Sequence, residues 1–250
     1  MKSFVRLLKA DFLKIRHTPM LWIHMIVPAS IAILLLIYYA FSHQIALGKV
    51  AGLMELLGVG FPLVIGIITA MAIDQEASAG HFGEILMARG KIKCFLSKLC
   101  MLLLMALGSL LIAIGGFALG FQFILHQNQF SVSFYGQLII VLFLSQIFLY
   151  LLHTICSLRF GTGASIGLGI AESLIAALMI TGLGEGIWHW IPCSWGVRFN
   201  VYNLSLLAHS GVSQCIKELI SGGTICFMAT ILLFVFSLIW FHYFEGRSEN

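Results

Sequence analysis

The densest group of charged residues lies between Met71 and Lys93, in the stretch MAIDQEASAGHFGEILMARGKIK. Only 10% of the chain is charged, yet this stretch holds three acids and three bases. They are Asp74, Glu76, Glu84, Arg89, Lys91 and Lys93. Such groups can act as general acids and bases, bind a nucleotide or bind a partner protein.

Sequence motifs for the first two of these roles are absent. The chain contains neither the HExxH pattern of zinc proteases nor the EExxxR pattern of membrane-embedded prenyl-proteases. Gly48-Lys49 and Gly90-Lys91 are each followed by an aliphatic residue and lack the earlier glycine of a GxxxxGK[ST] phosphate loop. The six cysteines show no CxxC or Cys/His spacing typical of zinc or redox sites. We therefore expect no catalytic residue, metal or cofactor in this chain, and any energy for transport would come from a partner subunit or an ion.

The overall composition is that of an integral membrane protein. Mean hydropathy is +1.02, and 60% of the residues are hydrophobic, which is more apolar area than a soluble globular surface could hide. About 20 apolar residues are needed to cross the bilayer as a helix. The sequence contains six apolar windows of about that length, at residues 20–41, 53–73, 95–122, 136–157, 163–184 and 220–242. The sequence therefore predicts an all-α integral membrane protein with six transmembrane helices.

The distribution of Lys and Arg predicts the topology. With both termini in the cytoplasm, all Lys and Arg residues except Lys49, Arg198 and Lys217 would lie on the cytoplasmic side, as positive residues do in membrane proteins. No cleavable signal peptide is expected, because a charged segment precedes the first apolar run and no small-residue cleavage site follows it. The charged stretch is then cytoplasmic, and the connection at residues 185–219 is external.

Residues 1–19 predict an amphipathic helix that lies on the inner membrane surface before the first span. Phe4, Leu8, Phe12 and Ile15 recur at helical spacing, and basic residues lie off that face. Pro19 ends the segment. The helix could be a positively charged anchor or a specific docking element, and the sequence favours neither.

Residues 74–94 have the pattern of a docking segment. Acidic residues follow the second predicted span in the chain. After them, Phe82, Ile85 and Leu86 lie on one side of a short predicted helix. An alternative is an ordinary solvated connection whose apolar residues pack against two spans that extend slightly beyond the bilayer.

The same residues resemble those of the ABC-2-type permeases. Between their second and third spans these permeases carry an acid, a glycine four residues later, an aliphatic pair, a basic turn and a lysine at the start of the next span. Here these are Glu76, Gly80, Ile85-Leu86, Arg89 and Lys98. The stretch QEASAGHFGEILMARGKIKCFLSKL is similar, more narrowly, to the MutG-like permeases of lantibiotic protection (immunity) transporters. A proline that many ABC-2 permeases carry at this turn is replaced by Arg89-Gly90.

This resemblance implies that residues 1–250 form one ABC-2-type transmembrane domain in a bacterial cytoplasmic membrane. It implies a separate cytoplasmic ATPase dimer that binds ATP and Mg, a second identical or related permease subunit, contact with membrane lipid, and no nucleic acid partner. The expected cargo is a lantibiotic peptide expelled from the membrane. The expected ATPase contacts are Asp74, Gln75, Glu76, Gly80, His81, Phe82 and Glu84.

Two further places are candidates for a substrate pathway. Glu172 lies within the fifth predicted span, where an ionisable group is costly and should face a cavity, a partner helix or a proton. A structural alternative is a bond from Glu172 to Gln146, His153 or another buried polar group. The external connection carries Trp188, Trp190 and Trp195, which could form an aromatic belt or a re-entrant or surface-lying helix that meets an amphipathic peptide.

Cys193 and Cys215 both lie on the external side and could form a disulfide. The cargo could be another amphipathic or lipid-like molecule. A six-span membrane enzyme is disfavoured by the missing acid–base and metal-ligand sets, and a self-sufficient secondary transporter by the lack of ion-coupling groups.

Overall fold

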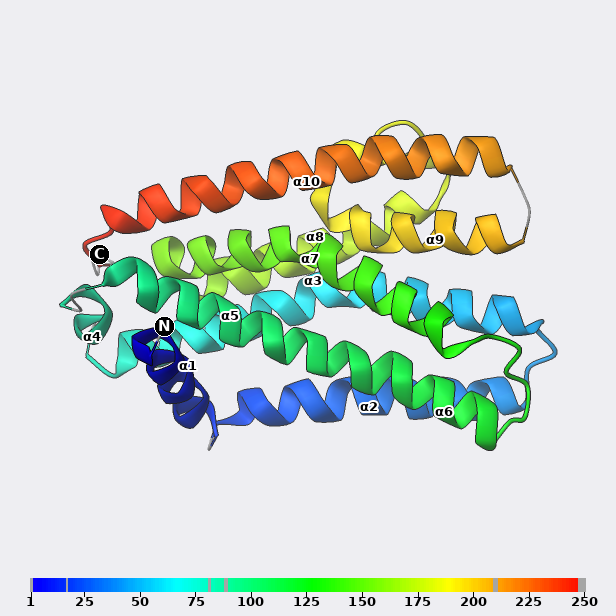
Figure 1. The fold of residues 1–250 in the computed structure, drawn as a ribbon, viewed down its shortest axis with the longest axis horizontal. Helices are drawn as coiled ribbons and strands as arrows, with labels where there is room; N and C mark the ends of the chain where they lie inside the picture. Colours follow the sequence, from blue (N-terminus) through cyan, green and yellow to red (C-terminus); the bar gives the residue numbers. More distant parts are fainter. Residues whose placement is uncertain (1, 17, 81, 88–89, 209–210, 247–250) are drawn as a thin grey trace.

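The computed structural model describes residues 2–16, 18–80, 82–87, 90–208 and 211–246, and these are helical with no strand among them. The long helices run side by side along the longest axis of the molecule (Figure 1). In chain order the elements are α1 (Lys2–Ile15), α2 (Pro19–Ala40), α3 (Ala46–Ser78), α4 (Gly83–Leu86), α5 (Lys91–Leu110), the π-helix η1 (Leu111–Gly115), α6 (Gly116–Phe123), α7 (Val132–Phe160), α8 (Thr162–Ile180), the 3-10 turns η2 (Gly182–Gly184), η3 (Trp188–Trp190) and η4 (Pro192–Ser194), α9 (Trp195–Leu207) and α10 (Val212–His242).

The prediction of six spans is confirmed. Six helices are long and apolar enough to cross a bilayer: α2, α3, the continuous α5–η1–α6 rod, α7, α8 and α10. The second span is longer than the apolar window, because α3 continues to Ser78 and carries Asp74 and Glu76 on its last turns. The third span contains a single π-turn at Leu111–Gly115, a local insertion that such helices tolerate.

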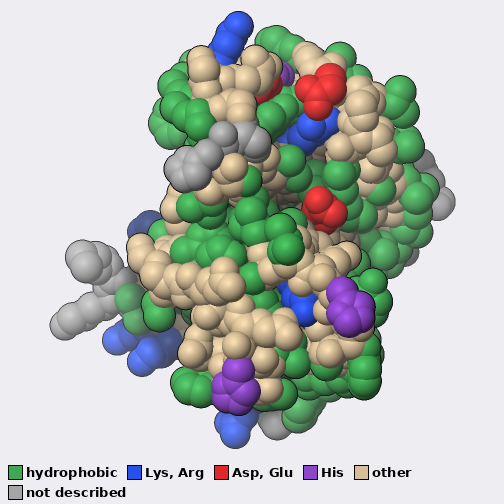
Figure 2. All heavy atoms as spheres, turned by 90° about the vertical axis from the view of Figure 1, so that its right-hand side faces the viewer, with side chains coloured by type: hydrophobic (Ala, Val, Ile, Leu, Met, Phe, Trp, Pro, Cys, Tyr) green, Lys and Arg blue, Asp and Glu red, His purple; other side chains and the backbone are tan. Residues whose placement is uncertain are grey.

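The two ends of the chain lie at the same end of the bundle, as an even number of spans requires (Figure 1). Helix α1 crosses this end at a steep angle to the spans, in the manner predicted for an interfacial helix, and α4 lies nearby. The other end carries the connections at residues 41–45 and 124–131. In Figure 2, which shows that other end, a few acidic, basic and histidine side chains lie among apolar and neutral atoms, some of them beside one another.

Helix α3 is the central element of the bundle, and it packs against α7, α8 and α9. Its closest neighbour is α8, and glycines make that approach possible. A Cβ on Gly169 would lie 2.8 Å from the carbonyl oxygen of Pro62, and one on Gly66 would lie 2.7 Å from that of Ser165. Small residues at these two positions therefore set the spacing of the two helices.

The connection at residues 185–219 is mostly packed structure. After α8, the three short turns η2, η3 and η4 lead back along the bundle, so that α9 starts about midway along α10 and runs to the end opposite the termini (Figure 1). Helix α9 packs between α3, α7 and α10. The helix anticipated in this region therefore exists, and it is inserted among the spans.

Candidate functional site

The charged stretch folds into the end of α3, a tight turn, the one-turn helix α4 and the start of α5. The turn depends on left-handed backbone at Gly80, where φ is 147°, and at Phe82, where φ is 64°. A glycine is needed at the first of these positions because side chains rarely tolerate that conformation. His81 and Arg89 lie outside the described residues, as does the side chain of Glu84.

A buried ion cluster ties three helices together beside this turn. Glu76 Oε1 on α3 lies 2.5 Å from Lys98 Nζ on α5 and 3.1 Å from Lys14 Nζ on α1. Lys98 Nζ also lies 3.1 Å from Asp11 Oδ1, and the Ser97 hydroxyl donates to Asp11 Oδ2 at 2.5 Å. Two acids and two bases thus neutralise one another, with Lys14 at the exposed edge of the cluster and Lys98 and Glu76 buried. Removal of one member would leave a buried charge without its partner.

The cluster corrects the expectation that Glu76 faces a partner protein. Its side chain is only 3% exposed and is fully engaged by the two lysines. The neighbouring Gln75 also turns inward, since its Nε2 donates to the carbonyl oxygen of Lys14 at 2.9 Å. Glu76 and Gln75 therefore hold α1 against α3. A sequence signal for this inward role of Glu76 and Gln75 exists on α1. Asp11 and Lys14 are an acid and a base three residues apart, so they lie on the same side of the helix.

Phe82 is likewise buried and does not project toward a partner. Its side chain is 4% exposed and packs edge-on against Phe244, with ring centroids 5.8 Å apart. Lys91 Nζ donates to the carbonyl oxygen of Phe244 at 2.6 Å. The end of α10 thus closes over the turn and fixes α4. The surface that remains open comprises Asp74, Ser78, Ala79, Gly80 and Met87, of which Met87 is 85% exposed.

Glu172 belongs to a second buried network, inside the bundle. Its Oε2 lies 2.8 Å from His153 Nε2 on α7, and His153 Nδ1 lies 2.9 Å from the Ser165 hydroxyl oxygen. Ser165 in turn donates to the carbonyl oxygen of Gly66 at 3.0 Å. Of the alternatives for Glu172, the structure shows the bond to His153. The chain of contacts joins α3, α7 and α8 in the region where Gly66 allows close approach.

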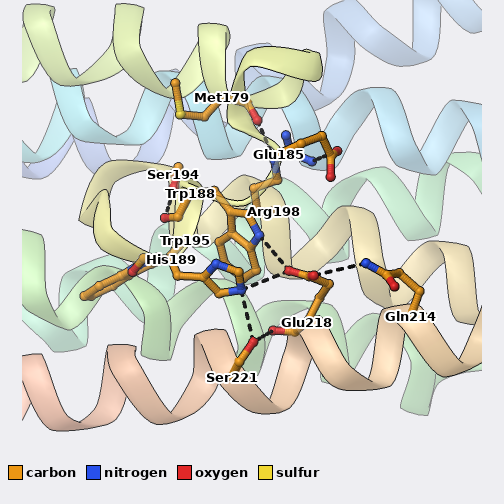
Figure 3. A network of polar contacts seen from close by, with 10 residues as sticks. All are labelled: Met179, Glu185, Trp188, His189, Ser194, Trp195, Arg198, Gln214, Glu218 and Ser221. Carbon is orange, nitrogen blue, oxygen red and sulfur yellow. Dashed lines mark hydrogen bonds and ion pairs between the residues drawn. The ribbon is translucent and has the colours of Figure 1, made fainter.

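The three tryptophans of the connection at residues 185–219 differ in their surroundings. Trp188 and Trp195 are fully buried, which corrects the expectation of an aromatic belt for these two, whereas Trp190 is 74% exposed. Trp188 Nε1 donates to Glu218 Oε2 at 3.2 Å, and Trp195 Nε1 donates to the His189 carbonyl oxygen at 2.8 Å (Figure 3). The indole rings are therefore packing groups whose N–H groups are satisfied.

Glu218 on α10 is the centre of the contacts that hold this segment. His189 Nε2 lies 2.9 Å from Glu218 Oε2 and 3.0 Å from the Ser221 hydroxyl oxygen, and Gln214 Nε2 donates to Glu218 Oε1 at 3.2 Å (Figure 3). The Trp188 ring fits beside Gly222, where a Cβ would come within 2.3 Å of it. Sequence reasoning did not identify Glu218, because Trp188 and His189, which it holds in place, are about 30 residues away in the chain.

Arg198 on α9 holds the end of α8. Its guanidinium donates to the carbonyl oxygen of Met179 and pairs with Glu185 Oε1 at 3.0 Å (Figure 3). It also donates at 2.9 Å to the carbonyl oxygen of Thr181, the residue that follows α8. The Met179 carbonyl belongs to the last turn of α8, where carbonyl groups have no partner within the helix. A cation at this place also interacts favourably with the helix dipole.

Among the described residues there is no group of three His, Cys, Asp or Glu side chains that could hold a metal. Cys193 and Cys215 are both free thiols, so the disulfide left open by the sequence is not formed. The geometry is that of helices held together at both ends of a membrane bundle.

Comparison with known proteins agrees with this architecture. A family model described as ABC-2 family transporter protein matches residues 7–184, from α1 to the turn after α8. No curated protein and no solved structure matches the chain significantly. The match covers the ion cluster, the α4 turn and five of the six spans. This chain therefore belongs to the ABC-2 family of transporter proteins, as a multi-pass permease of the plasma membrane that works with an ATP-binding subunit.

Proposed function

We propose that this permease belongs to an ATP-driven exporter that removes a lantibiotic from the cell membrane and so protects the cell. The resemblance of residues 75–99 to the MutG-like permeases supports this cargo. The observation that carries coupling to an ATPase is the ion cluster of Asp11, Lys14, Glu76 and Lys98, because it joins three helices rigidly behind the α4 turn. A push on that turn would move α1, α3 and α5 together.

The contact with the ATPase would use the open surface beside the cluster. Asp74 offers a charge, and Met87 offers an exposed, flexible apolar side chain that can enter a groove. Glu76 and Phe82 would support this surface from behind. This division differs from the one proposed from sequence alone, in which Glu76 and Phe82 themselves made the contact.

The cargo would meet the permease in the half of the bundle away from the termini. Trp190, Leu183 and Ile187 expose apolar side chains next to the acidic Glu185, which is 65% exposed. An amphipathic cationic peptide that lies in the outer leaflet presents complementary groups. Orientation is part of the same proposal: the end with both termini is cytoplasmic, so a reporter fused after Asn250 is expected inside and one inserted at Gln127 outside.

The test is protection of a lantibiotic-sensitive host that expresses the permease with its ATPase and any second permease subunit. Asp74→Arg and Met87→Asp should reduce copurification of the ATPase and abolish protection, while the permease is present in the membrane at its normal level. Lys9→Gln, on the exposed side of α1, is the matched control.

The cargo surface is tested separately. Trp190→Ala should raise sensitivity to the lantibiotic without changing ATPase binding, whereas Trp22→Ala, an exposed tryptophan on the first span, should have no effect. If the complete complex assembles and hydrolyses ATP but gives no protection from any lantibiotic, the cargo is a different amphipathic or lipid-like molecule.

A further inference from the structure

A narrow crevice lies between the first two spans, away from the surfaces described above. His24, Val27 and Ile31 of α2 form one wall, and Leu56, Gly60 and Val64 of α3 form the other. Ser109 of α5 and Tyr150 of α7 lie at its floor. Because Leu56 is exposed and Val27, Ile31, Gly60 and Val64 are half-buried, the crevice opens on the lipid-facing side of the bundle.

One polar atom in this crevice stands out. His24 is 4% exposed, and its Nδ1 lies 2.9 Å from the carbonyl oxygen of Met20. A carbonyl oxygen only accepts, so Nδ1 carries the ring proton and Nε2 of the neutral ring presents a lone pair. Nε2 is buried and has no hydrogen-bond partner among the described residues.

The rest of His24 is fully satisfied. Pro28 has no N–H to give to the carbonyl oxygen of His24 one turn earlier, and the Ser109 hydroxyl donates to that oxygen at 2.9 Å instead. Nε2 is therefore the single unmet polar group of the residue within this part of the bundle. A buried acceptor in a membrane-spanning helix is costly to leave unpaired, so the site favours a ligand that brings a hydrogen-bond donor.

The shape of the crevice limits what that ligand is. The enclosed cavity is about 50 Å³, which admits a small head group and excludes a folded peptide, so an alkyl chain would lie in the open, lipid-facing part of the crevice. The wall on α3 runs from Ile68 to Leu56, a length of about 18 Å at 1.5 Å per residue. His24 lies about 8 Å along α2 from Pro19, and Ser109, which bonds to its carbonyl oxygen, lies near the middle of the third span. The polar end of the crevice thus lies within the hydrocarbon region, in the half of the bundle next to α1.

We propose that this crevice binds a single-chain amphiphile from the leaflet next to α1, whose hydroxyl-type donor bonds to His24 Nε2 and whose alkyl chain lies along α3. The ligand enters sideways from the bilayer, since both walls are spans. This site is independent of the cargo and of the ATPase contact. It would make the packing of α2 on α3 sensitive to lipid composition.

The test uses the permease in lipid nanodiscs and two photoreactive probes, hexadecanol with a mid-chain diazirine and its methyl ether. The alcohol donates a hydrogen bond and the ether cannot. Labelling of peptides from α2 and α3 by the alcohol should exceed labelling by the ether about tenfold, the value of one buried hydrogen bond. His24→Phe should remove that difference.

Gly60→Leu tests the site by filling it. No heavy atom lies within 4 Å of a Cβ built on Gly60, so the larger side chain enters the crevice without a clash at its base. Labelling by the alcohol should fall at least fivefold. Gly108→Leu on α5 is the matched control, because a Cβ there also meets open space.

Two results would overturn the proposal. Equal labelling of the wild type by alcohol and ether would show that Nε2 recognises no donor, and this comparison decides even if His24→Phe fails to fold. Labelling that is unchanged in Gly60→Leu, or no stronger in α2 and α3 than on exposed faces of α10, would mean that the crevice holds water only.

Discussion

Glu76 Oε1 on α3 and Lys98 Nζ on α5 lie 2.5 Å apart, with side chains 3% and 4% exposed. Removing one member of such a buried pair leaves an uncompensated charge, which costs about 3–5 kcal/mol. We therefore expect Glu76→Gln and Lys98→Gln each to lower the unfolding temperature of the purified permease strongly. The unfolding temperature of the double variant should fall by much less than the sum of the two single decreases, because Asp11 and Lys14 remain as one acid and one base.

The control for this cycle is Lys9→Gln, since Lys9 is exposed on the same helix as Lys14. Its unfolding temperature should equal that of the wild type. Additive losses in the double variant would show that Glu76 and Lys98 act independently, and the cluster could then not link α3 to α5.

Arg198 and Glu185 form an ion pair, and the two residues should contribute unequally to the free energy of unfolding. Arg198→Gln leaves the last carbonyl groups of α8 without their charged donor and should cost about 3 kcal/mol. Glu185→Gln should change the free energy of unfolding by less than about 1 kcal/mol, since Glu185 is 65% exposed and Arg198 keeps its carbonyl partners. Chemical denaturation in detergent measures both. Equal losses would mean that the pair, and not the capping of α8, fixes Arg198.

The sequence predicts the spans well because the requirement for about 20 apolar residues is local. The role of Glu76 is not local: its partner Lys14 is 62 residues away, and only the packing of α1 across the bundle turns the carboxylate inward. Phe82 illustrates the same limit, since its burial depends on Phe244 at the other end of the chain. Trp188 and Trp195 are of a residue type that is common at the membrane surface. Insertion of α9 between α3, α7 and α10 nevertheless buries both of them. Glu172 was partly predictable, because a carboxylate inside a span needs a partner and His153 was one of few candidates.

Cys193 should be unreactive although it lies outside the six spans, in the connection at residues 185–219. Burial raises the pKa of its thiol to about 12, and the charge of Glu172 adds to the shift. A raised pKa means that the thiol keeps its proton as the pH rises, so almost no thiolate is present between pH 7 and 9. Maleimide labelling, read by peptide mass, should leave Cys193 unmodified over that range.

The matched control is the variant Trp190→Cys, which places a thiol at an exposed position three residues from Cys193. This thiol should react readily with maleimide, and faster at pH 9 than at pH 7. Labelling of Cys193 at a similar rate would mean that η4 opens to water and that the turns before α9 are not packed as described.

Glu172 and His153 share one proton whose presence follows from their neighbours. Ser165 donates to the carbonyl oxygen of Gly66 and so accepts from His153 Nδ1, which must carry a proton. A second proton must then lie between His153 Nε2 and Glu172 Oε2, on one atom or the other. Glu172→Gln keeps a donor toward Nε2, because its amide can take the place of the protonated carboxyl group. We expect this variant to retain membrane insertion, thermal stability and transport.

Other substitutions of Glu172 should destabilise the permease to different extents. Glu172→Leu removes the donor and leaves Nε2 unpaired, at a cost of about 1–3 kcal/mol. Glu172→Lys adds a buried cation with no acid to balance it in this network, so it should damage assembly most. Thermal stability in detergent and the amount of protein in the membrane measure the order Gln, Leu, Lys. If Glu172→Lys is as stable as the wild type, the side chain reaches water along the open face of α8 and the contact with His153 is not what holds α7 and α8 together.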